Sequence, residues 1–284
     1  MNSPIVRWLQ RVLPAHHAAR LVLAATQLAH AFAQIRNVFR RHPIWRIVVD
    51  VHGVILKDRL RVEWNKKRPQ LDVGKKNAKS WKLEDDVLAL HGEEAVAHVL
   101  GQARIDVQVK PGSDDNSRSK LIRRALRADV LAIYNTPGYY RSLEPIQENV
   151  RQLKRLLDRD DCEVVIGTAV PDENVTGKAE TEALLREVLG QEYFDKLYAR
   201  VFFAGRKINK GDLFFHFIFE DNPHLSSYLG INAGVHLIVE AEHNRNTQLR
   251  WNQKFVPHGT DWAVAAGMEP APRQKKRKKK AAVT

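Results

Sequence analysis

The sequence predicts an α/β protein with an open, mostly parallel, Rossmann-like sheet and a helical cap inserted after the first strand. Three observations predict this fold class. Short apolar runs alternate with amphipathic helical stretches, and the runs are continuously apolar, as in parallel strands that are covered on both faces. A long charged segment, residues 57–137, separates the first run from the others. At 284 residues, the chain is long enough for one large domain with such an insertion.

The elements follow from the periodicity of the apolar residues. The first strand is predicted at "RIVVDV", residues 46–51. Helices are expected near 84–101 and 117–132 within the insertion, and at 143–159 and 178–198 after it. The later strands are expected at "CEVVIGTAV" (162–170), "ARVFFAG" (199–205), "LFFHFIFEDNP" (213–223) and "GVHLIVEA" (234–241). The predicted organisation is a basic leader at 1–44, a core at 45–56 and 138–264, a cap at 57–137 and a basic tail at 265–284.

The positive charge belongs to the two ends of the chain. The formal net charge is +13, but residues 1–49 carry seven arginines and no acid, and residues 273–284 carry seven Lys and Arg and no acid. The rest of the chain is close to neutral, so the basicity says little about what a central site binds.

Both ends leave alternatives open. The leader is predicted to be helical over residues 5–41, and this acid-free pattern is typical of a mitochondrial transit peptide, of a helix packing on the domain, or of one binding an acidic partner. The tail is predicted to be disordered, acting as a nuclear-import-like signal, a nonspecific nucleic-acid tether or a solubilising segment.

Other features exclude some classes of protein. Cys162 is the only cysteine, which excludes an internal disulfide and favours a reducing compartment. We expect a cytoplasmic location, with a mitochondrial one from the leader or a nuclear one from the basic tail as the alternatives. No apolar run reaches the roughly 18 residues that a membrane span needs. Dinucleotide-binding and Walker glycine motifs are absent. Nothing in the sequence indicates the oligomeric state.

Polar side chains gather where the predicted strands end. In a parallel sheet these ends meet at one edge, where ligands bind. In chain order the residues are Asp50, His52, Thr168, Lys207 or Lys210, Glu220 and Asp221. Phosphoryl transfer to a carboxylate needs such a set: a nucleophile, acids that hold a divalent cation through hard oxygen ligands, and a hydroxyl and an ammonium that bind the remaining phosphate oxygens.

This ordered set resembles the haloacid dehalogenase-like superfamily. The resemblance rests on "VVDVHGVI", "VVIGT", "GRKINKG" and "FIFEDNP", in that order, and covers about residues 45–262. Within that superfamily, "NTPGYYRSLEPIQENVRQLKRL" and the segment from "EDNPHLSS" to "DW" look like the corresponding parts of 5′(3′)-deoxyribonucleotidases.

The resemblance implies a Mg²⁺-dependent phosphomonoesterase that acts on a nucleotide. It implies that Asp50 is the nucleophile and forms an aspartyl-phosphate, and that Asp221 binds Mg²⁺ together with the main-chain carbonyl of residue 52, with Glu220 close by. Thr168 and a lysine would bind phosphate, with Lys207 favoured over Lys210. Tyr139, Tyr140 and Arg141 would lie near the nucleoside; packing in the hinge between cap and core is the alternative for the two tyrosines.

His52 departs from the family pattern, which has an acid–base aspartate at that place. An imidazole can also do acid–base chemistry. Three interpretations stay open: His52 takes over the aspartate's role, turnover is slow and the aspartyl-phosphate accumulates, or catalysis is lost. The alternative functions are accordingly a phosphatase acting on polynucleotide ends and a catalytically silent, nucleic-acid-associated scaffold.

Overall fold

The computed structural model describes residues 44–74, 80, 82–101, 115–197, 201–204, 210, 215–223, 234–241, 243–245 and 247–268. The leader helix predicted over 5–41, residues 269–284 of the basic tail and Lys207 lie outside these residues, so their predictions stay predictions. The predicted tail begins too early, because Ala265 ends a helix and both Ala265 and Met268 are buried in the core. No helix of the described part is long and apolar enough to span a bilayer.

A parallel sheet organises the described residues, as the sequence predicts. Its strands are β1 (Trp45–Val49), β4 (Cys162–Ala169), β5 (Val201–Ala204), β6 (Phe217–Glu220), β7 (Val235–Val239) and β8 (Gln253–Val256). They lie in the order β5-β4-β1-β6-β7-β8, and every neighbouring pair is parallel. The sequence order reverses at β1, which has β4 on one side and β6 on the other, so the carboxyl end of β1 is the expected ligand-binding point.

The two faces of the sheet are buried by different side chains, because alternate strand residues point to opposite faces. Val49 and Phe219 face the main core, where Phe219 stacks on Trp262 with ring centroids 4.3 Å apart. Val48 and Ile218 face the other side and form a second cluster with Phe215. Burial on both faces explains why these strands are continuously apolar.

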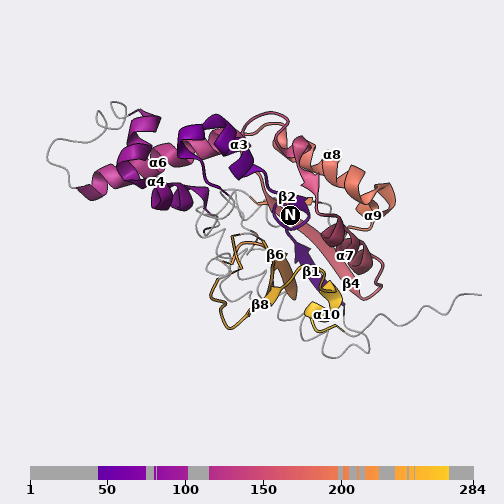
Figure 1. Cartoon of the computed structure of the whole chain (residues 1–284). Coiled ribbons are helices and arrows are strands. Elements are labelled where there is room, and N and C mark those ends of the chain that lie inside the picture. Colours follow the sequence, from indigo (N-terminus) through magenta and orange to yellow (C-terminus); the bar gives the residue numbers. More distant parts are fainter. Residues whose placement is uncertain are drawn as a thin grey trace, which may run out of the picture.

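Helices follow the strands and cover the sheet (Figure 1). They are α7 (Gln147–Leu157), α8 (Gly177–Leu189), α9 (Gln191–Asp195) and α10 (Trp262–Ala265). Helix α7 packs on β4 and α10, and it buries Val150, Leu153, Leu156 and Leu157 on one face, as its periodicity predicts. The side chain of Asp261 caps α10 by accepting from the amides of Ala263 and Val264.

The predicted insertion is helical. It contains α3 (Leu60–Lys67), the 3₁₀ turn η1 (Pro69–Leu71), α4 (Leu83–Leu100) and α6 (Asp115–Tyr134). Figure 1 shows α3, α4 and α6 grouped together, away from α7, α8 and α9. We call this group the cap.

Two connections join the cap to the core. Strand β2 (Leu56–Lys57) leads from the core into the cap. It pairs antiparallel with β3 (Glu144–Pro145), which leads from the cap back to the core. The returning chain also forms the 3₁₀ turn η3 (Tyr140–Ser142) before β3. Because β2 starts only a few residues after Asp50, the cap enters and leaves beside the carboxyl end of β1.

Candidate active site

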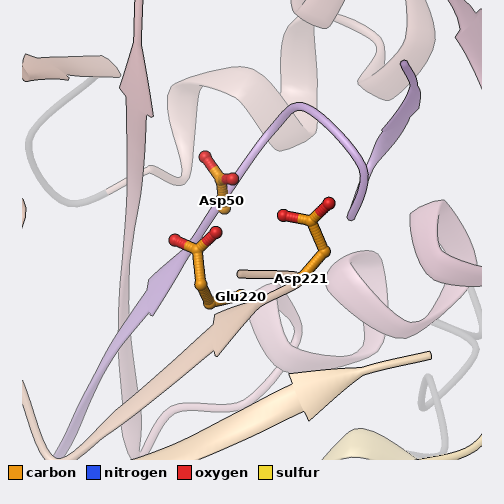
Figure 2. A group of neighbouring side chains, drawn as sticks. All are labelled: Asp50, Glu220 and Asp221. Carbon is orange, nitrogen blue, oxygen red and sulfur yellow. The ribbon is translucent and has the colours of Figure 1, made fainter. Parts of the chain in front are cut away.

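Three carboxylates converge where β1 and β6 end. Asp50 directly follows β1, Glu220 is the last residue of β6, and Asp221 follows it. Val49 lies in register with Phe219, and the Asp50 amide donates to the Phe219 carbonyl at 2.9 Å, which fixes the two strand ends side by side. Ligand oxygens of the three acids lie within 4.8 Å of one another. Figure 2 shows the three carboxylates around a shared space, with Asp50 on one chain segment and the other two on the next strand.

The three acids crowd one another in a buried place. Asp50 is 4% exposed and Glu220 is 2% exposed. Burial, and then the nearby Asp50 charge, raise the pKa of Glu220 well above its usual value, and the same two causes raise the pKa of Asp221 to about 7. The cluster therefore holds more negative charge than its surroundings neutralise.

Lys210 supplies one compensating charge. Its ammonium lies 2.7 Å from Asp50 Oδ1 and 2.8 Å from Glu220 Oε2. Burial alone would lower the pKa of Lys210, but the Asp50 and Glu220 carboxylates outweigh that effect and raise it, so the lysine stays charged. The sequence left the choice between Lys207 and Lys210 open and favoured Lys207. The structure places Lys210 in the cluster, while Lys207 lies outside the described residues.

Asp221 is held in place from two directions. Asn244 Nδ2 donates to the Asp221 carbonyl at 2.9 Å, and His243 Nε2 lies 3.2 Å from that carbonyl and 3.5 Å from the carboxylate oxygen Oδ2. Burial lowers the pKa of His243, so it adds little positive charge. Gly53 packs directly against the Asp221 carboxylate. Its φ is +81°, and a Cβ there would lie 2.0 Å from Asp221 Oδ2. A side chain at position 53 would thus displace the carboxylate.

His52 and Thr168 form a neutral pair beside the acids. Thr168 is fully buried near the end of β4, and its hydroxyl lies 3.1 Å from His52 Nδ1. Burial lowers the pKa of His52, which favours the neutral ring. If Thr168 donates this hydrogen bond, its hydroxyl proton and the lone pair of His52 Nδ1 are both paired; if the ring donated it, the buried hydroxyl proton would have no acceptor among the described residues. We therefore assign the proton of the neutral ring to Nε2, which is buried without a partner in the described part of the chain.

The two tyrosines predicted near the nucleoside are buried in the hinge. Tyr140 is 1% exposed and packs on His52 with ring centroids 5.0 Å apart, and Tyr139 is 5% exposed. The Tyr139 hydroxyl donates to Asp58 Oδ1 at 2.7 Å, and the Tyr134 hydroxyl lies 3.3 Å from Asp58 Oδ2. This arrangement favours the packing alternative over stacking on a base. Arg141 is exposed and forms an ion pair with Glu187 on α8.

The sequence predicts that Asp50, His52, Thr168 and the Glu220-Asp221 pair lie close together, and the structure places all of these side by side. The sequence alone gives no role to Asp58, His243 or Asn244. The latter two lie in "EHNRN", within the stretch that carries the resemblance, but a short polar loop after a strand gives no signal of which side chain turns back toward the site. Asp58 belongs to no sequence motif. Only the fold shows that it connects the segment that enters the cap with the segment that leaves it.

The donor set fits a hard divalent cation. Three carboxylates and one ammonium leave a net charge of about −2 if all are ionised, in a place that water does not reach freely. Both Glu220 oxygens have protein partners, Lys210 on one and the Asn222 amide at 3.3 Å on the other. Asp50 and Asp221 are therefore the acids best placed to hold a cation, with Glu220 fixing the lysine.

Comparisons with known proteins give structural likeness only. No family model and no curated protein matches the chain. A haloacid dehalogenase-like family hydrolase from Xanthomonas campestris has 12% sequence identity and a TM-score of 0.39, over 80% of this chain and 96% of its own. A HAD-superfamily hydrolase, subfamily IA, variant 1, from Geobacter sulfurreducens has 11% identity and the same TM-score, over 81% and 99%. A defluorinating L-2-haloacid dehalogenase has 11% identity and a TM-score of 0.35, over 81% and 98%. At this level of similarity no activity transfers, and the chemistry of the site rests on its own residues.

Proposed function

We propose that this chain is a Mg²⁺-dependent phosphomonoesterase of the haloacid dehalogenase-like type, with Asp50 as nucleophile and a nucleotide-like substrate. The observation that carries the proposal is the meeting of Asp50, Asp221 and Lys210 at the carboxyl ends of β1 and β6. The nucleotide preference rests on the resemblance of the sequence alone.

The residues of the chain divide the work of phosphoryl transfer. A carboxylate oxygen of Asp50 attacks phosphorus, the bond from phosphorus to the ester oxygen breaks, and an aspartyl-phosphate forms. Lys210 opposes the negative charge that the incoming phosphate adds to Asp50. Mg²⁺, held by Asp50, Asp221 and the main-chain carbonyl of residue 52, would supply further positive charge against the transferred group.

His52 stands where the ester oxygen departs. With its proton on Nε2, the ring can donate a hydrogen bond to that oxygen. Its other nitrogen accepts from Thr168 and has no free lone pair for activating water. This arrangement supports the second of the three interpretations of His52, in which hydrolysis of the aspartyl-phosphate is the slow step.

Phosphate release tests the proposal. Purified protein with Mg²⁺ is expected to hydrolyse p-nitrophenyl phosphate or a nucleoside monophosphate, and a chelator is expected to stop the reaction. Asp50→Asn is expected to lower the rate by at least about 10³-fold, because the amide is not a nucleophile. Asp195→Asn, the same substitution on the exposed helix α9, is the control and is expected to stay within about twofold of the parent rate. Equal activity in the Asp50→Asn protein would refute the nucleophile.

A further inference from the structure

A pocket of about 500 Å³ lies where the chain enters and leaves the cap. One wall comes from α3 and the residue before it, and the other from the chain between the end of α6 and η3. We call it the hinge pocket. Its volume is typical of small-molecule sites, which measure roughly 300–1,000 Å³. The described residues that line it, none of which belongs to the cluster around Asp50, are Arg59, Glu63, Lys66, Lys67, Ile133, Thr136, Pro137, Gly138, Tyr139 and Ser142.

Two cations on the α3 wall share a single carboxylate oxygen. Arg59 Nη2 lies 3.3 Å and Lys66 Nζ lies 2.9 Å from Oε1 of Glu63. Arg59 Nη1 also donates to the Ser142 carbonyl at 3.4 Å, so this arginine reaches from one wall of the pocket to the other. One carboxylate neutralises only one of the two cations, which leaves one positive charge in excess.

The same sharing recurs at the end of α3. Lys67 Nζ lies 3.4 Å from Oδ1 of Asp129 on α6, and Arg68 Nε lies 2.6 Å from Oδ2 of the same carboxylate. On this side of the cap, four cations therefore share two carboxylates, and two positive charges are in excess. Basic residues in the last turn of a helix also favour the helix itself, so it is the pocket beside them that indicates a ligand.

The opposite wall offers apolar surface and hydrogen-bond acceptors. The Thr136 hydroxyl donates to the Ala132 carbonyl at 3.0 Å, and the Ser142 hydroxyl donates to the Tyr139 carbonyl at 2.7 Å. Both hydroxyl protons are thus used within the chain, and only lone pairs remain for a ligand. An anionic group therefore fits the α3 wall, and a neutral carbon skeleton fits the other. The apolar lining residues there are Ile133, Pro137 and Tyr139.

We propose that the hinge pocket binds a phosphorylated organic molecule, with its phosphate on the cations of α3 and its carbon skeleton against the chain that leaves the cap. A phosphate monoester carries a charge of about −2 at pH 7, which matches the two positive charges in excess. The Arg59 guanidinium and the Lys66 ammonium supply charge-assisted hydrogen bonds. Such a ligand contacts both connections of the cap and would hold the cap in the position seen in the structure.

Titration calorimetry of the full-length protein in EDTA tests the inference. Without a divalent cation, the buried acids around Asp50 repel phosphate, so the measurement reports on the hinge pocket. The titrants are phenyl phosphate, glucose 6-phosphate and adenosine 5′-monophosphate, with inorganic phosphate for comparison. At least one ester is expected to bind at least about tenfold more tightly than inorganic phosphate, because its carbon skeleton buries apolar surface.

Three variants locate the ligand. Lys66→Glu reverses the most exposed cation of the pocket lining and is expected to weaken ester binding at least about tenfold. Lys120→Glu makes the same change on an exposed part of α6 outside the pocket lining and is expected to stay within about twofold. Thr136→Trp fills the pocket without changing its charge and is expected to abolish the advantage of the ester over inorganic phosphate. Thermal unfolding checks that each variant is folded.

Several outcomes would overturn the inference. They are no ester with a dissociation constant below about 1 mM, equal affinity for the esters and inorganic phosphate, and equal weakening in Lys66→Glu and Lys120→Glu. An affinity that changes in Asp50→Asn but not in Lys66→Glu would also overturn it, because that ligand would lie at the reaction centre. The inference does not rest on the proposed function: binding is measured without Mg²⁺, so absence of hydrolysis leaves it untouched.

Discussion

The site has two halves of opposite character, which meet at the turn after β1. The charged half consists of Asp50, Lys210, Glu220 and Asp221. The neutral half consists of His52, Thr168 and Tyr140. In the charged half, burial forces like charges together around one ammonium. In the neutral half, burial keeps an imidazole uncharged between a hydroxyl and an aromatic ring. The difference teaches that burial has opposite effects on the two halves: it raises the pKa of the carboxyl groups of Glu220 and Asp221 and lowers the pKa of the His52 imidazole. Under the proposed function, the charged half would bind and attack the phosphate, and the neutral half would limit proton transfer.

Removing the one cation of the charged half is expected to have the largest effect. Lys210→Met leaves Asp50 and Glu220 buried without their partner, which costs roughly 3–5 kcal/mol of unfolding free energy. Urea denaturation at pH 7.5 without metal measures this loss. Lys196→Met breaks an exposed pair with Asp158, which solvent screens, and is expected to cost far less. Equal losses in the two variants would mean that the charged half is not a buried ion cluster.

A second buried imidazole, that of His236, can be compared with His52, whose ring is hydrogen-bonded to the Thr168 hydroxyl. His236 on β7 is fully buried, neither ring nitrogen has a partner among the described residues, and burial lowers its pKa to about 4. The unfolded chain has the ordinary value near 6.5, so between pH 6.5 and 4 the unfolded state binds more protons. The contribution of His236 to stability is therefore constant above pH 6.5 and falls by up to roughly 3 kcal/mol as the pH drops toward 4.

The His236→Leu protein isolates this contribution. Its unfolding free energy, measured in urea at several pH values, is expected to lose less than that of the parent between pH 6.5 and 4. Parallel pH curves for the two proteins would contradict the neutral, unpartnered state of His236.

Divalent cations are expected to stabilise the charged half. Mg²⁺ at about 100 times its dissociation constant would add roughly 2.7 kcal/mol and raise the melting temperature. Asp221→Asn removes a ligand and is expected to abolish most of that rise. In metal-free buffer near pH 8 the same variant is expected to be at least as stable as the parent, because it relieves the repulsion that raises the pKa of Asp221. A full Mg²⁺ effect in the variant would remove Asp221 from the cation site.

The smallest effect is expected in the neutral half. Thr168→Val removes one buried hydrogen bond and leaves His52 Nδ1 without its donor, at a cost of about 1–2 kcal/mol. Nitrogen NMR of His52 in the parent is expected to show the proton on Nε2. A proton on Nδ1 would reverse the direction of the bond to Thr168 and remove the argument for a slow second step.

Much of the fold is readable from the sequence because its strands are buried on both faces. Continuous apolar runs mark β1, β4, β5, β6 and β7, and the charged insertion marks the cap. Strand β8 was missed because "QKFV" is only four residues long, contains a lysine and is followed by Pro257. Helix α3 was missed because five of its eight residues are polar or charged and only Leu60 and Trp64 are buried, which is too few to show a helical periodicity.

The candidate site is less completely readable, for a physical reason. Asp50 and Asp221 directly follow strands and Thr168 lies near the end of β4, so sheet register fixes where they lie. Lys210 lies between β5 and β6, where spacing along the chain does not determine whether Lys207 or Lys210 reaches the acids. Tyr139 and Tyr140 carry a motif-like pattern, yet their burial in the hinge depends on contacts with Asp58 and His52 that no local pattern encodes.

Detection of the phosphorylated enzyme tests most directly whether these groups act on one phosphorus atom. Protein mixed with p-nitrophenyl phosphate and Mg²⁺, quenched in acid within seconds and digested, would be examined by mass spectrometry after reduction of any acyl phosphate with borohydride. Conversion of Asp50 to homoserine, dependent on Mg²⁺ and absent when substrate is omitted, is the expected result. Release of phosphate with residue 50 unmodified at every quench time, or the label on another side chain, would contradict it.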